Sequence, residues 1–141
     1  MSYHDIHENN IEAVIKFFKI QLLGQIKKTK LIMVSCNIDD STILALVGAL
    51  LKIGNFELEL LDLSYNNFSD EGCIHLTNLF QTGKRIKSLG LGKNYLITAQ
   101  GFKTIMKSIR KNPIISSIDF SQCSIDISGN QGIDSVLEDI Q

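Results

Sequence analysis

Residues 58–68 read LELLDLSYNNF, and this stretch determines the architecture of the chain. Its residues follow the pattern L-x-x-L-x-L-x-x-N-x-φ, in which φ is an apolar residue. The pattern recurs in residues 86–96, IKSLGLGKNYL, and in residues 115–125, ISSIDFSQCSI. A weaker copy, with Lys28 in the first apolar position, occupies residues 28–38, KTKLIMVSCNI. The copies lie 28 to 30 residues apart, which predicts a repeat protein.

The second half of each copy carries apolar residues at four-residue steps. Gly72, for example, is followed at this spacing by Leu76 and Phe80. Side chains four residues apart lie on one face of a helix, so each copy predicts a strand, a loop and an amphipathic helix. The four helical stripes begin at Thr42, Gly72, Gly101 and Gly132.

These motifs resemble the leucine-rich-repeat family, and a period of 28 to 29 residues with a helix in each unit is similar to its ribonuclease-inhibitor-like subtype. The resemblance covers residues 28–140, about four repeats. It implies an α/β fold: a right-handed solenoid shaped as a short horseshoe arc, with a parallel sheet on the concave face and helices on the convex face. The asparagine of the motif defines a ladder position, which we expect to be buried and to bond backbone groups of adjacent turns. Cys36 and Cys123 replace asparagine at two of the four ladder positions, where we expect buried thiols.

The sequence predicts one domain with two ends of different character. Residues 1–27 form an N-terminal tail and capping helix, and residues 28–141 form the four-repeat domain, which ends in a polar capping helix. The strand near 117–121 leaves an open sheet edge, at which a partner or a second copy of the chain could pair to form a dimer.

Composition excludes several classes of function. The net charge of −1 lacks the basic excess of a nucleic-acid-binding protein. No apolar run reaches the length of about 18 to 20 residues that a membrane span needs, and the first ten residues are polar, so we predict no membrane span and no classical signal peptide. Three cysteines without a C-x-x-C pair favour a reducing compartment, which is either the cytoplasm or a host cytosol.

No metal or cofactor site is predicted. His4 and His7 lack a convincing third ligand. Residues 90–94, GLGKN, look superficially like a phosphate-binding loop, but Lys87 stands where that motif needs glycine and Asn94 where it needs Ser or Thr. Gly90 and Gly92 are instead expected to be strand residues on the solvent-facing side of the sheet.

The concave face is the predicted binding site. Residues between the buried strand positions point away from the helices and form columns across the sheet. Apolar area there, beside two tyrosines on the rim, predicts a protein partner, unless the N-terminal segment folds over it. The predicted partner-binding residues are Ile32, Val34, Leu60, Asp62, Tyr65, Lys93, Tyr95, Asp119 and Gln122.

The resemblance implies a non-enzymatic protein-binding module, because ribonuclease-inhibitor-like members commonly occlude a functional surface of their partner, such as an active site. Plentiful Ile, Lys and Asn, with arginine only at positions 85 and 110, is typical of AT-rich genomes. A short repeat protein of this composition resembles effectors of intracellular bacteria, which act on a host protein or on another effector. One alternative to the protein-binding module is a hydrolase or transferase that uses Asp62 and Asp119, whose backbones we expect to lie about 10 Å apart. The other alternative is an adaptor fragment of a larger assembly.

Overall fold

The computed structural model describes residues 28–52, 57–81, 85–111 and 114–125. Strands alternate with helices along these residues, so the fold is α/β. The predicted N-terminal capping helix and polar C-terminal capping helix lie outside the described residues. In chain order the elements are β1 (Lys28–Ile32), α2 (Asp40–Lys52), β2 (Glu57–Asp62), α3 (Asp70–Gln81), β3 (Arg85–Gly90), α4 (Ala99–Ser108), the 3-10 helix η1 (Ile109–Lys111) and β4 (Ser117–Asp119).

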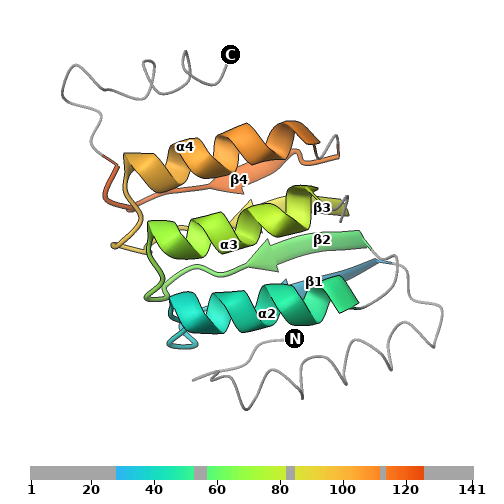
Figure 1. Cartoon of the computed structure of the whole chain (residues 1–141), viewed down its shortest axis with the longest axis horizontal. Coiled ribbons are helices and arrows are strands. Elements are labelled where there is room, and N and C mark those ends of the chain that lie inside the picture. Colours follow the sequence, from blue (N-terminus) through green and yellow to red (C-terminus); the bar gives the residue numbers. More distant parts are fainter. Residues whose placement is uncertain (1–27, 53–56, 82–84, 112–113, 126–141) are drawn as a thin grey trace.

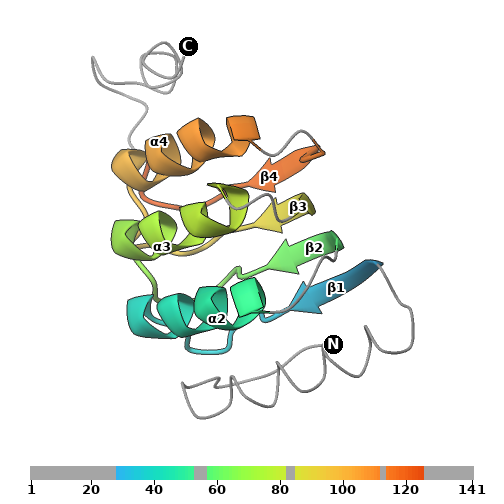
Figure 2. The ribbon, with the colours of Figure 1, turned by 45° about the vertical axis from the view of Figure 1, so that its right-hand side comes forward.

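The four strands form one parallel sheet in the order β1-β2-β3-β4, which confirms the predicted parallel sheet (Figure 1). Parallel neighbours need a crossover connection, and helices α2, α3 and α4 lie in the three crossovers. These helices cover one face of the sheet, so the structure has two layers (Figure 2). We call the other side of the sheet the open face, because none of these helices lies on it. No helix in the described part of the chain is long and apolar enough to cross a membrane.

The pairing of the strands confirms the predicted columns. Ile32 pairs with Asp62, Asp62 with Gly90, and Gly90 with Asp119. Hydrogen bonding between neighbouring units of the sheet continues beyond the ends of the strands. The backbone N–H groups of Met33, Leu63 and Leu91 each donate a hydrogen bond of 2.8 Å to the next unit. The acceptors are the carbonyl oxygens of Asp62, Gly90 and Asp119, respectively.

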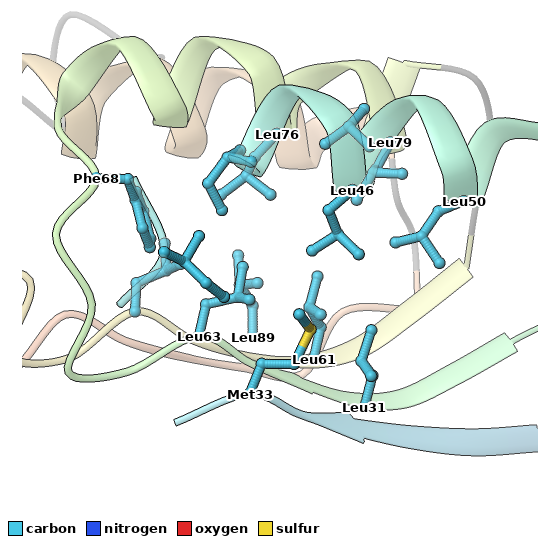
Figure 3. Packing of buried hydrophobic residues seen from close by; sticks show 14 of the residues in the cluster. Leu31, Met33, Leu46, Leu50, Leu61, Leu63, Phe68, Leu76, Leu79 and Leu89 are labelled. Carbon is cyan, nitrogen blue, oxygen red and sulfur yellow. The ribbon is translucent and has the colours of Figure 1, made fainter. Parts of the chain in front are cut away.

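The core lies between the sheet and the helices. Leu61, Leu63 and Leu89 reach it from the strand side, and Leu46 and Leu76 reach it from the helices (Figure 3). All five are buried, which confirms these predicted core positions of the first three units. Burial of these leucines needs neighbouring units, because one strand and one helix cannot cover each other completely.

The third unit departs from the predicted motif by one residue. The last apolar residue of the motif is buried in the first two units, as Ile38 and Phe68, but in the third unit Leu96 is 57% exposed and Ile97 is fully buried in its place. The buried residue follows the ladder position by two residues at Ile38 and Phe68 but by three at Ile97. The extra residue lengthens the loop and displaces Leu96 outward.

Buried asparagines join consecutive units, as the sequence predicts. Asn66 Oδ1 accepts hydrogen bonds from the N–H groups of Cys36 and Ile38, both at 3.0 Å, and Asn66 Nδ2 donates to the carbonyl oxygens of Met33 and Leu63. Each asparagine side chain therefore supplies hydrogen bonds to backbone groups of the unit before it.

The two ladder cysteines differ in burial. Cys36 is fully buried, but Cys123 is only half-buried, so the expectation of a buried thiol is wrong for Cys123. Cys123 lies in the last described unit and has a described neighbouring unit on one side only. Its thiol donates to the carbonyl oxygen of Leu91 at 3.2 Å, which replaces one of the bonds that asparagine makes elsewhere.

Aspartates at the starts of the helices form a second connection between units. Asp40 accepts hydrogen bonds from the N–H and hydroxyl groups of Ser69 and from the N–H of Gly72, at 2.7 to 2.8 Å. Asp70 binds the N–H and hydroxyl groups of Thr98 in the same way. A Cβ at Gly72 would lie 2.7 Å from Asp40 Oδ1, so this carboxylate requires glycine there. The helical stripe begins with glycine at this position because a carboxylate of the preceding unit approaches it.

Candidate functional site

The predicted binding residues lie on the open face and along the edge where the strands end. Ile32, Val34 and Leu60 are half-buried, so they offer less apolar area than the sequence predicts. Asp62 and Asp119 lie on either side of Gly90 in one column, and Tyr65, Lys93, Tyr95 and Gln122 follow the strand ends.

Two aspartate–serine pairs lean over the glycines of the third unit. Asp62 Oδ1 accepts hydrogen bonds from the hydroxyl of Ser64 at 2.7 Å and from its N–H at 3.1 Å. A Cβ at Gly90 would lie 2.6 Å from the same Asp62 oxygen. Gly90 faces the side that the sequence predicts, but it is buried, because the side chains of the second unit cover it.

Asp119 repeats this arrangement from the opposite side. Its Oδ1 accepts a hydrogen bond from the N–H of Ser121 at 2.8 Å, and a Cβ at Gly92 would lie 3.1 Å from its Oδ2. Hydrogen bonds from the side chain and the backbone of Ser121 hold the pKa of the Asp119 carboxyl below its usual value. Asp62 and Asp119 therefore both lean toward the strand between them.

A hollow of about 230 Å³ lies between these two aspartates. Its polar wall consists of the two carboxylates and three serines, with the hydroxyl of Ser117 donating to that of Ser88 at 3.0 Å. Leu60 supplies an apolar wall, and Gly90 supplies a floor without a side chain. The hollow is smaller than the range of about 300–1,000 Å³ that is typical of small-molecule sites. Its size suits a single side chain better than a metabolite.

The rim of the open face consists of residues that follow the strand ends, and its backbone repeats in every unit. Ser35, Tyr65, Lys93 and Gln122 have φ angles of 55°, 60°, 60° and 59°. The left-handed conformation costs a residue with a side chain about 1–2 kcal/mol, a cost that glycine avoids. None of the four positions carries glycine, so each unit keeps a side chain here at the expense of stability.

Lys93 contacts Tyr65 at the rim. Its ammonium donates a hydrogen bond to the hydroxyl of Tyr65 and lies 4.2 Å from the centre of that ring. This hydrogen bond raises the pKa of Lys93, and the charges of the nearby Tyr65, Tyr95 and Asp119 act in the same direction. Tyr65 and Tyr95 are 47% and 59% exposed. The structure thus brings two of the predicted residues, Tyr65 and Lys93, into contact at the rim.

Sequence reasoning missed one rim residue and two apolar residues on the helices. Leu96 joins Tyr95 at the rim because of the longer loop in the third unit. The longer spacing between Asn94 and Ile97 was the signal for it. Leu44 and Ile74 are also exposed, at equivalent positions on α2 and α3. They lie on the helical layer, away from the open face.

Candidates for metal or nucleophilic chemistry gain little from the structure. The described residues contain no group of three or more His, Cys, Asp or Glu side chains suited to a metal ion, and His4 and His7 lie outside them. His75 lies 3.9 Å from Glu71 on the same helix. Burial raises the pKa of the Cys73 thiol to about 12, which makes a thiolate nucleophile unfavourable.

Comparisons with known proteins leave the family open. No model of a known protein family matches the chain, and no curated protein matches it.

Proposed function

We propose that this chain is a non-enzymatic protein-binding module that engages a partner protein through the open face and its rim. The proposal includes the finer form of the fold: a right-handed solenoid of ribonuclease-inhibitor-like leucine-rich repeats, in which the open face is the concave face. Occlusion of an active site of the partner, and action as a bacterial effector on a host protein or another effector, belong to the same proposal and rest on the resemblance.

The observation that supports it most directly is the Tyr65–Lys93 pair. Both residues occupy left-handed backbone positions at which glycine would be more stable, and both present large side chains at the rim. The adjacent buried asparagines fix the backbone beneath them. Exposed aromatic residues on a rigid support lose little conformational entropy on binding, which is typical of the residues that dominate protein interfaces.

The alternative of a hydrolase or transferase receives less support from the same residues. A pair of carboxylates that cleaves a glycosidic bond needs one member with a raised pKa, which acts as the general acid. The pKa of Asp119 is lowered by the hydrogen bonds from Ser121, so Asp119 does not suit the role of the general acid. The small volume of the hollow also favours the docking of a side chain over a substrate.

Binding by variants of the full chain tests the proposal. Capture from the native cells, followed by mass spectrometry, first identifies the partner. Tyr65→Ala or Tyr95→Ala should then weaken binding by roughly 1–3 kcal/mol, about 5- to 150-fold in Kd, with little change in stability. Leu44→Ala is the matched control, because it removes an exposed apolar side chain from the helical layer and should leave Kd unchanged.

Two outcomes would contradict the proposal. The triple variant Asp62→Arg, Tyr65→Ala, Tyr95→Ala could fold normally and bind the partner with undiminished affinity, which would exclude this face. Alternatively, Asp62→Asn or Asp119→Asn could abolish a turnover while the complex still forms, which would establish the enzyme instead.

A further inference from the structure

Among the residues that the structure describes, no cation lies against the two carboxylates of the hollow between Asp62 and Asp119. Within the described residues neither carboxylate takes part in a salt bridge. Lys93 lowers the pKa of Asp119 only as a minor contributor through its charge, and its ammonium is bonded to Tyr65. Carboxylates held in place by serines, on the walls of a concave site, are complementary to a positively charged side chain.

The other groups of the hollow narrow the choice of side chain. The hydroxyl groups of Ser88 and Ser117 line the hollow together with the carboxylates. The two hydroxyl oxygens lie 3.0 Å apart and offer further hydrogen-bond acceptors. Arginine carries five N–H donors in a planar fork, whereas lysine has a single ammonium. Leu60 offers an apolar contact for the methylene stem of a long side chain. The fork of arginine matches several acceptors spread around a hollow better than a point charge does.

We propose that the hollow receives an arginine side chain of the partner protein, whose guanidinium binds between Asp62 and Asp119. This inference rests on the proposed function and specifies the chemistry of the partner. Glycine at position 90 is needed for this site. A Cβ there would lie 2.6 Å from Asp62 Oδ1, so any side chain would displace the Asp62 carboxylate. A partner that binds through the tyrosines of the rim would thus place a basic residue over β3.

A small probe tests the hollow without the partner. N-acetyl-arginine methylamide is titrated into the ¹⁵N-labelled full chain, and N-acetyl-citrulline methylamide serves as its neutral counterpart of nearly the same shape. The arginine probe should shift the amide signals of Ser88, Gly90 and Ser117 in a saturable way, with a Kd on the order of 1–10 mM for a single charged side chain. The citrulline probe should not shift them.

Variants of Asp62, Asp119 and Gly90 test whether these residues bind the arginine probe. Asp62→Asn and Asp119→Asn keep an acceptor oxygen for the serine hydrogen bonds and should each weaken the probe at least about fivefold. Gly90→Ala should weaken it as well, by displacing Asp62. Glu71→Gln is the matched control, because it removes the same charge from the exposed side of α3 and should leave the Kd unchanged.

Three results would overturn the inference. They are no saturable shift up to about 50 mM of the arginine probe, equal shifts with the citrulline probe, or a Kd for the arginine probe in both Asp→Asn variants that equals that of the unmodified protein. Shifts by Ca²⁺ without shifts by arginine would reassign the hollow to a metal ion. If the arginine probe fails while Tyr65→Ala still weakens the partner, the proposed function stands and this inference alone is wrong. If the probe binds but the tyrosine variants bind the partner normally, the proposed function is wrong instead.

Discussion

The side-chain oxygen of Asn94 accepts a hydrogen bond from the backbone N–H of Asn66, 28 residues earlier, at 3.0 Å. Asn94 Nδ2 also donates to the carbonyl oxygens of Leu63 and Leu91, at 3.0 and 2.9 Å. Asn94 is fully buried, so water does not replace these bonds if the side chain is removed. One amide thus satisfies backbone groups of two units.

Asn94→Ala should therefore lower the free energy of unfolding by about 3–5 kcal/mol, because each buried group left without a partner costs roughly 1–3 kcal/mol. Asn94→Cys should be less damaging, since the thiol of Cys123 donates to a carbonyl oxygen from an equivalent position. Denaturant unfolding of the two variants measures the difference. Equal loss in both would show that hydrogen bonding does not explain the ladder residues.

The aspartate connection predicts a second effect on stability. Asp70→Ala removes the acceptor for the N–H and hydroxyl groups of Thr98 and should destabilise the protein by about 1–3 kcal/mol. Glu71→Ala at the next position should change the stability by less than about 0.5 kcal/mol, because its side chain is exposed. Thermal and denaturant melts of both variants provide the comparison. A larger effect from Glu71 would contradict the role of Asp70.

The longer loop of the third unit is tested by two adjacent residues. Ile97→Ala should cost about 2–5 kcal/mol, as expected when a fully buried aliphatic side chain is truncated. Leu96→Ala should stay within about 0.5 kcal/mol, because Leu96 is mostly exposed. The sequence motif alone predicts the reverse order, so the ranking of the two unfolding midpoints decides between them.

The three cysteines should differ in reactivity toward a thiol reagent. Burial raises the pKa of Cys123, an effect that the N–H groups of Asn94 and Lys93 partly offset, and burial raises that of Cys73 to about 12. The thiolate is the reactive form, so labelling of Cys123 should be slow near neutral pH and should accelerate as the pH rises beyond 9. Cys36 and Cys73 are buried and should react only on unfolding. Mass spectrometry of the labelled native protein measures this order, and early labelling of Cys36 would contradict the packing.

The spacing predicted one strand and one helix per unit, because apolar residues at ladder intervals are explained in this way. The resemblance that rests on this spacing implied a parallel sheet, which the structure confirms. The spacing also predicted the columns of the open face, since the period of a strand is two residues. The same spacing misplaced Leu96, because a one-residue insertion in a loop leaves the periodicity on both sides intact. The spacing could not predict that Gly90 is buried or that the Asp62 side chain points toward it, because both depend on the rotamer of a neighbouring side chain.

The left-handed rim positions show the same limit. Tyr65 and Lys93 are poor indicators of positive φ, since Gly and Asn adopt it more readily. Only the equivalence of four units reveals them as one feature, and that equivalence becomes informative once the backbone is known.

The direction in which Asn66 and Asn94 act has a consequence for protein synthesis. Each asparagine accepts hydrogen bonds from backbone N–H groups of the unit before it. These N–H groups therefore lack their acceptor until the following unit has been synthesised and has folded. The nascent chain then gains its tertiary structure one unit behind translation. A chain truncated between residues 66 and 94 would hold a first unit whose backbone groups are bonded by Asn66 and a second unit whose equivalent groups lack Asn94.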